Sequence, residues 1–208
     1  SYASAEEIKF DVAELLRPPK RISVAEAAAA SLRIDTGSGA YSPWNPEETP
    51  NIIEPMNCLN SRLYDVVCFV GPARDGKTMG LVDGWVTYVT VYDPSDMLIV
   101  QITEEKAREY SKKRLDREFR NSPDIKARLS PRHHDNNVHD KIFRAGNYLK
   151  IAHPSNNTFA SSDFKYVALT DFDRLSGDVG GEGDGFKQAK KRTTTFGSNG
   201  MTLVESSP

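Results

Sequence analysis

Cysteine is scarce in this chain of 208 residues, in which only Cys58 and Cys68 occur. Two cysteines cannot build a disulfide framework, so a small disulfide-stabilised secreted fold is excluded and a reducing, intracellular setting is indicated. Cys68 lies inside the apolar run 66–70, where we expect it to be a small buried hydrophobic residue.

Long hydrophobic runs are missing as well. The longest stop at about five residues, whereas a membrane-spanning helix needs roughly 20 apolar residues. No charged, apolar and small-residue leader opens the chain, so we expect a protein that is neither secreted nor membrane-spanning. An excess of one charge is missing too, since 27 Lys and Arg face 29 Asp and Glu. Any contact with nucleic acid or anionic lipid must therefore be local.

The first 60 residues predict a helical and loop-rich lead-in. Apolar residues spaced as on one helix face predict a first helix over residues 8–16, which the two following prolines end. Ser23 and Glu26 form a capping-box pattern ahead of a second helix that runs to Ala30. Residues 36–55 are rich in Gly, Ser and Pro and predict an irregular loop.

From residue 61 onward, short apolar runs alternate with helical patterns. Such alternation predicts an α/β domain with a mostly parallel sheet flanked by helices. We expect strands at 66–70, 97–102, 166–170 and 201–204, and a hairpin of 141–144 and 148–151 that turns at Gly146. We expect helices at 78–90, from the cap Thr103 to Pro123, and at 186–194.

The sharpest motif is a full G-x-x-x-x-G-K-T between a predicted strand and a predicted helix. Its residues are Gly71, Pro72, Ala73, Arg74, Asp75, Gly76, Lys77 and Thr78. The glycines let successive amides face one concavity, and the helix N-terminus adds its positive dipole end, so the loop is suited to a phosphate anion. Lys77 is expected to reach the β and γ oxygens, Thr78 to offer its hydroxyl to Mg²⁺, and Arg74 to sense the γ-phosphate or form a surface salt bridge. A chance glycine loop that caps a helix is the alternative.

Phosphate chemistry of this type also needs a carboxylate at the end of a neighbouring strand. Asp171 and Asp173 follow the predicted strand 166–170, and 93 residues lie between Lys77 and Asp171. This distance leaves room for an additional strand, as in RecA-like P-loop motors rather than compact kinases. Two roles need filling, metal ligand and general base, and the residues leave their assignment open because Thr170 precedes Asp171 where an Asp-Glu pair is usual.

The chain resembles the large terminase subunits of tailed double-stranded DNA bacteriophages, of the lambda-like GpA type. The likeness covers most of the chain and includes the lead-in, the phosphate loop and the segment around Thr103. Its most specific matches are Asp171-Phe172-Asp173, the segment 178–184, Arg192-Thr193-Thr194-Thr195-Phe196 and Ser206-Ser207-Pro208.

This resemblance implies the ATPase domain of a DNA-packaging motor that uses ATP and Mg²⁺. The implied partners are double-stranded viral DNA, a small terminase subunit, the portal protein of the procapsid and further copies in a ring, with no membrane. The implied place of action is the host cytoplasm. A lead-in over 1–60 would pack on an ATPase core over 61–208, and the nuclease domain of the family would follow downstream.

The resemblance also implies roles for the residues after the second motif. The family's metal-side Asp falls on Thr170, its catalytic Glu on Asp171 and its last Asp on Asp173. Asp171 is therefore expected to be the catalytic residue, with Thr78, Asp171 and Asp173 toward the metal and Ser206 and Ser207 in the segment that couples hydrolysis to DNA movement.

Other interpretations stay open at this point. Residues 103–132 hold ten Lys or Arg and six Asp or Glu, which fits either contact with the DNA backbone or, more simply, a solvated helix face. Arg114, Arg117, Arg120 or Arg128 is a candidate arginine finger to a neighbouring subunit. Two further functions remain, a helicase-like motor on free nucleic acid and a nucleotide-gated assembly module that hardly hydrolyses ATP.

Overall fold

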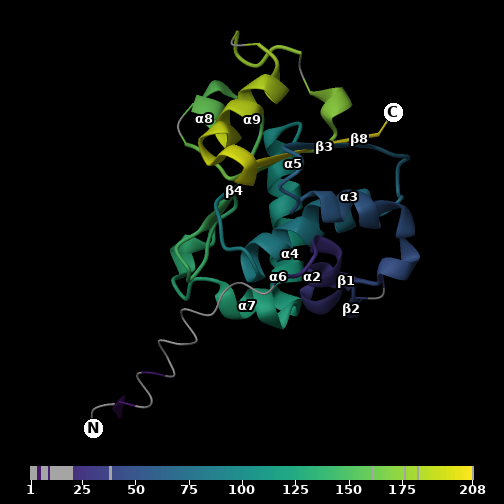
Figure 1. Ribbon diagram of the computed structural model, residues 1–208, viewed down its shortest axis with the longest axis vertical. Coiled ribbons are helices and arrows are strands. Elements are labelled where there is room, and N and C mark those ends of the chain that lie inside the picture. The colour runs from purple at the N-terminus through teal and green to yellow at the C-terminus, as the bar shows by residue number, and fades with distance from the viewer. Residues whose placement is uncertain are drawn as a thin grey trace.

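A six-stranded sheet forms the middle of the molecule (Figure 1). The computed structural model describes residues 4, 5, 9, 21–37, 39–160, 162–175, 177–181 and 183–207. The helix predicted over 8–16 falls, apart from residue 9, outside the described residues. The strands, in spatial order, are β3 (Val66–Val70), β8 (Met201–Ser206), β7 (Tyr166–Leu169), β4 (Met97–Val100), β6 (Tyr148–Ala152) and β5 (Asp140–Ile142).

Five of these strands are parallel, and only β5 runs antiparallel to its neighbour β6. The strand that lies between β3 and β7 in space is β8, the last strand in the sequence. The phosphate loop leaves β3 and the Asp171 turn leaves β7, so both motifs emerge at the carboxyl edge of the sheet with β8 between them. This edge is where ligands bind in open α/β sheets.

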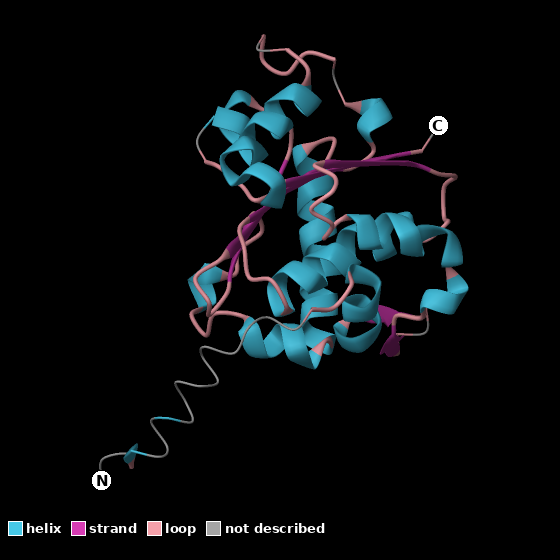
Figure 2. Ribbon diagram, in the orientation of Figure 1, coloured by secondary structure: helices cyan, strands magenta, loops and turns pink. Residues whose placement is uncertain are grey.

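Helices cover both faces of the sheet (Figure 2). One face carries α2 (Val24–Ser31), α3 (Ile53–Cys58), η3 (Thr78–Asp83) continued by α4 (Gly84–Val91), α5 (Glu104–Glu109), η4 (Tyr110–Leu115), α6 (Asp116–Asn121) and α7 (Pro123–Arg128). The other face carries α8 (Asn156–Ala160) and α9 (Gly185–Thr193). Among the described residues, no helix combines the length and apolar content that crossing a membrane requires.

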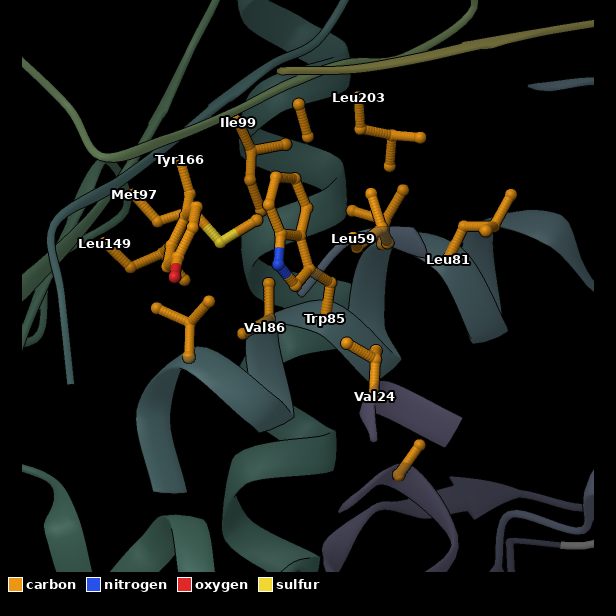
Figure 3. Packing of buried hydrophobic residues seen from close by; sticks show 14 of the residues in the cluster. Val24, Leu59, Leu81, Trp85, Val86, Met97, Ile99, Leu149, Tyr166 and Leu203 are labelled. Atoms are coloured by element: carbon orange, nitrogen blue, oxygen red, sulfur yellow. The ribbon is translucent and has the colours of Figure 1, made fainter. Parts of the chain in front are cut away.

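Alternation along the strands divides the core into two layers. In β4, Met97 and Ile99 pack with the α2–α4 side, whereas Leu98 and Val100 pack with the α8–α9 side. Trp85 of α4 is fully buried in the first layer, with its ring centroid 5.2 Å from that of Tyr166 (Figure 3). A strand buried on both faces explains why the runs in β4 and β7 are apolar without a break.

Three local sequence signals produce the predicted structure. Ser23 and Glu26 form the capping box at the start of α2, each accepting a hydrogen bond from the other's backbone amide. Thr103 caps α5 by accepting from the amide of Lys106. The β5–β6 hairpin turns at Gly146, whose φ of 89° favours glycine.

The segment 36–55 is more regular than an irregular loop, and this expectation was wrong in part. It contains β2 (Tyr41–Pro43), which pairs with β1 (Arg33–Asp35), and two 3₁₀ turns, η1 (Pro46–Glu48) and η2 (Pro50–Ile52). Trp44 is buried in the main core cluster. The aromatic anchor and the two prolines at turn starts give the segment its structure despite its loop-like composition.

The expectation of a buried Cys68 was also wrong. Strand β3 lies at the edge of the sheet, so the face that carries Cys68 and Val70 is exposed, and Val70 is 60% exposed. Val67 points the other way and is buried in the core. An apolar run of five residues does not reveal whether a helix covers both faces of the strand, because that depends on the strand order.

The remaining 3₁₀ turns connect these elements. They are η5 (His133–Asp135), η6 (Phe172–Arg174) and η7 (Thr194–Asn199). The turn η6 follows β7 directly and carries Asp173, so it belongs to the same sheet edge as the phosphate loop.

Candidate functional site: the phosphate loop and the ends of β7 and β8

The phosphate loop 71–78 connects β3 to the helix that begins at Thr78 and continues through α4. Two of its residues have positive φ, Arg74 at 66° and Gly76 at 82°. A side chain at Gly76 would be strained by this conformation and would meet the methyl group of Thr49 at 2.7 Å. The second glycine of the motif is therefore required by the backbone of the loop and by its contact with the lead-in.

The side chain of Lys77 lies inside the loop. Lys77 is buried, and its Nζ donates a 2.8 Å hydrogen bond to the carbonyl oxygen of Pro72. Its ammonium lies 3.7 Å from a carboxylate oxygen of Asp75 and 3.7 Å from Oε1 of Glu205. The amide of Lys77 donates to Asp75 as well, at 3.0 Å. The predicted phosphate lysine is thus held between the loop and strand β8.

The loop begins beside the end of β8. The amide of Gly71 donates to the carbonyl oxygen of Ser206 at 3.2 Å, which extends the parallel pairing of β3 and β8 into the motif. Arg74, predicted to sense the γ-phosphate or to form a surface salt bridge, is exposed on the loop. Thr78, predicted to face the metal, stands at the first position of η3.

The second motif follows β7. Thr170 is buried, and its hydroxyl donates a 3.0 Å hydrogen bond to the carbonyl oxygen of Val100 on β4. This bond commits the Thr170 hydroxyl to the sheet. Asp171 has a φ of 47°, in the left-handed region that Asp and Asn adopt more readily than most residues, and its amide donates to Oε2 of Glu205 at 3.4 Å.

Asp173 is bound to the predicted coupling segment. Its Oδ1 accepts a 2.5 Å hydrogen bond from the hydroxyl of Ser206 and a 3.4 Å bond from the amide of Ser207, while its own amide donates to Ser206 Oγ at 3.2 Å. The Ser206 hydroxyl holds the pKa of Asp173 below its usual value by favouring the charged form. The structure therefore joins Asp173 to Ser206 and Ser207 directly.

Glu205 is the site residue that sequence reasoning missed. It lies on β8, is 1% exposed, and stands one position beyond the Leu169–Val204 register pair, opposite Thr170. Burial raises the pKa of the Glu205 carboxyl, and the charge of Asp171 adds to this effect, whereas Lys77 opposes it. The signal available in the sequence was a lone acid at the end of an apolar strand, directly before Ser206.

The residues present fit a magnesium ion held mainly through a nucleotide. In the part of the chain that the structure describes, no three His, Cys, Asp or Glu residues gather as a ready metal site. Mg²⁺ in nucleotide sites uses one or two protein ligands together with phosphate oxygens and water, so such a cluster is not required. One carboxylate oxygen at this edge, Oε1 of Glu205, is buried and accepts no hydrogen bond in the described structure. This oxygen is therefore still able to accept a hydrogen bond from a water molecule on the ion.

Arg114, a candidate arginine finger, is committed inside the protein. Its Nε donates to the buried carboxylate of Asp83 at 2.5 Å and lies 3.5 Å from Glu118. Arg117 and Arg120 are exposed, and Arg128 is partly exposed. A cleft of about 790 Å³, lined in part by Tyr92, Lys165 and Asn199, lies at the amino ends of the strands and hence away from the phosphate loop.

The chain was compared with known protein families, curated proteins and solved structures. Residues 38–208 match the family described as phage terminase large subunit gpA, ATPase domain. No curated protein matches the chain.

Among solved structures, the HK97 bacteriophage large terminase is similar, with a TM-score of 0.63 and 15% identity over 90% of this chain and 38% of that one. The large terminase ATPase domain of Thermus phage P74-26 gives a TM-score of 0.47 and 12% identity over 69% of this chain and 59% of that one. The chain spans less than two fifths of the HK97 protein. Together with the position of β8, the HK97 likeness confirms the predicted RecA-like α/β fold. The chain belongs to the family of phage terminase large subunit gpA ATPase domains.

Proposed function

We propose that this chain hydrolyses ATP with Mg²⁺ to drive double-stranded viral DNA into a procapsid. The observation that carries the proposal is the buried ammonium of Lys77, held 3.7 Å from Glu205 beside the Asp171 turn. A buried lysine at the start of a helix, with strained loop backbone around it, is suited to a polyphosphate anion.

Lys77 exchanges its contact with Pro72 for the β and γ oxygens of ATP, and backbone amides of the loop after Pro72, which itself has no N–H, surround the same phosphates. Thr78 is the residue that would hold Mg²⁺, and Asp173 would support the site, while Asp171 is kept for the attacking water. When bound, the ion neutralises charge that develops on the phosphate oxygens. Arg74, on the exposed side of the loop, adds a cation near the γ-phosphate.

Asp171 acts on the attacking water. Its carboxylate accepts a proton as the water oxygen forms a bond to the γ-phosphorus and the bond to the ADP oxygen breaks. When the γ-phosphate leaves, the turn that carries Asp171 and Asp173 moves. Asp173 transmits this movement through its hydrogen bonds to Ser206 and Ser207 at the end of β8. This path gives the predicted coupling segment a physical connection to the reaction.

The wider setting is part of the same proposal. The chain acts as one portion of a large subunit, in a ring with further copies, together with a small terminase subunit and the portal protein in the host cytoplasm. The division into a lead-in over 1–60 and a core over 61–208 stays a prediction. Val24 and Ala28 of α2, together with Trp44, are buried in the main core cluster, which supports packing of the lead-in on the core.

The test is steady-state ATP turnover by the complete subunit, with Lys77→Ala and Asp171→Asn. We expect both variants to lose at least 100-fold in rate, because one removes phosphate binding and the other the base. Lys187→Ala, at an exposed position of α9, is the matched control and keeps the wild-type rate. Unchanged rates in both site variants would refute the proposal.

One observation favours a second function, a nucleotide-gated assembly module. The Thr170 hydroxyl is committed to Val100, so the carboxylate that usually stands at this position is replaced by a group turned into the sheet. ATP binding without phosphate release, with partner proteins and DNA present, would select this function over the motor.

A further inference from the structure

Glu205 joins the two halves of the site. One oxygen of its carboxylate, Oε1, lies 3.7 Å from the ammonium of Lys77, and the other, Oε2, accepts from the amide of Asp171 at 3.4 Å. Strand β8 places it there because β8 pairs with β3, which carries the loop, and with β7, which carries the turn. Among the described residues, Asp75 and Glu205 form ion pairs with Lys77, and of these two only Glu205 also accepts from the amide of Asp171.

The environment of Glu205 makes its two contacts costly to lose. The residue is 1% exposed, and a buried carboxylate without a partner is strongly unfavourable. Oε1 receives no hydrogen bond in the described structure, so the nearby ammonium of Lys77 is its principal compensation. The 3.4 Å contact to Asp171 is long for a hydrogen bond and leaves room to tighten.

Triphosphate binding changes this balance. Lys77 must turn toward phosphate oxygens, and its attraction to Glu205 then weakens. Glu205 then has the Asp171 amide as its remaining partner. The hydrogen bond between them therefore becomes stronger in the ATP-bound state, in which Asp171 acts on water. Asp75 is not equivalent, because it belongs to the loop itself and accepts from the Lys77 amide two residues away.

We propose that Glu205 is a positioning residue: it holds Lys77 while the loop is free of nucleotide, and it draws in the Asp171 turn once a triphosphate occupies Lys77. This inference rests on the proposed ATPase function. It predicts that Glu205 resists nucleotide binding through Lys77 and promotes hydrolysis through Asp171, so the two effects have opposite signs.

Two substitutions separate these contacts in the complete subunit. Glu205→Gln removes the charge that holds Lys77 but keeps an oxygen that accepts from the Asp171 amide. Glu205→Leu removes both. The measurements are Kd for a fluorescent, non-hydrolysable ATP analogue, and kcat and KM for ATP. Glu104→Gln, at an exposed acid in the first turn of α5, is the control.

We expect Glu205→Gln to lower the Kd of the analogue at least threefold and to lower kcat only a few-fold. Glu205→Leu should keep the tighter binding and lose at least tenfold in kcat. In the wild type, hydrogen–deuterium exchange over residues 170–174 should slow when the analogue binds, and in Glu205→Leu it should not. Should the leucine variant fail to fold, Kd of the glutamine variant decides the matter.

The inference is overturned if the folded glutamine variant binds the analogue no more tightly than the wild type, or if affinity and kcat fall together. The wild type and Lys77→Ala distinguish this failure from failure of the ATPase function. A wild type that neither binds the analogue nor releases phosphate refutes both. A wild type whose activity depends on Lys77, with an unaltered Glu205→Gln variant, refutes the role of Glu205 alone.

Discussion

The hydroxyl of Ser206 and the carboxylate of Asp173 are 2.5 Å apart, and the Asp173 amide returns a hydrogen bond to the same hydroxyl. This reciprocal pair fixes the turn after β7 to the end of β8. Two segments that lie 33 positions apart in the sequence therefore meet as one unit at the edge of the sheet.

Ser206→Ala should lower ATP turnover of the complete subunit about tenfold, because the turn that carries Asp171 loses its two hydrogen bonds with the Ser206 hydroxyl. Binding of a non-hydrolysable analogue should change less than about threefold, since the phosphate loop is untouched. Ser207 contacts Asp173 through its backbone amide, so Ser207→Ala keeps that bond and is the control. An equal loss of turnover in both variants would contradict the role of the Ser206 hydroxyl.

Stability should depend on pH through a buried acid pair. Asp83 accepts from Tyr110 at 2.6 Å and from Arg114 at 2.5 Å, while Glu118, 6% exposed, shares the same guanidinium. Burial, and then the charge of Asp83, raise the pKa of Glu118 well above its usual value. Burial likewise raises the pKa of Asp83.

A carboxyl whose pKa is raised by folding keeps its proton up to a higher pH in the folded chain than in the unfolded one. Its contribution to the free energy of unfolding is full below the pKa of the unfolded chain and falls as pH rises toward the folded pKa, by up to about 1.4 kcal/mol per pH unit. Urea unfolding at pH 5, 6.5 and 8 should give a flatter dependence for Glu118→Gln than for the wild type. A profile parallel to that of the wild type would show that Glu118 does not titrate in this range.

Trp85 should dominate packing between α4 and the sheet. It is fully buried, and its ring lies against Tyr166. Trp85→Ala should lower the free energy of unfolding by about 3–5 kcal/mol through lost burial and a cavity. Trp85→Phe should cost about 1–2 kcal/mol, because most of the apolar volume remains and the indole N–H, which is buried without a partner in the described structure, is removed. Urea denaturation measures both, and equal losses would contradict this account.

The two thiols should differ in reactivity. Cys68 is exposed on the edge strand β3, whereas Cys58 is partly buried in α3. A small thiol reagent should modify the native protein in one fast and one slow phase. Cys68→Ser should remove the fast phase, and Cys58→Ser should keep it. The reverse assignment would mean that β3 is covered in solution.

Much of the fold could be predicted from local patterns. The capping box of α2 and the alternation of strands with helices after residue 61 act over short stretches of sequence, and the structure has them where they were expected. The exposure of Cys68 could not be predicted, because it depends on the place of β3 at the edge of the sheet. The short helices α7 and α8 were also not predicted, since each has only one or two turns of pattern.

The candidate site likewise has a part that the sequence predicts and a part that depends on the strand order. The loop 71–78 is a contiguous motif, and its start at the end of β3 follows from the sequence. Glu205 enters the site only because β8 lies between β3 and β7, a strand order set by packing of the whole sheet. The roles assigned to Thr78, Asp171 and Asp173 stay predictions.

The left-handed backbone at Asp171 limits which acid this turn can carry. At a φ of 47°, a short side chain that can bond its own backbone is tolerated, whereas a longer, more flexible one lacks that compensation. A glutamate is one methylene longer, and without that compensation it would shift the turn away from the amide contact with Glu205. Asp171 is one methylene shorter than the catalytic Glu that the family resemblance implies at this position, and the left-handed backbone favours the shorter acid. Replacing Asp171 by Glu alone would therefore displace the turn.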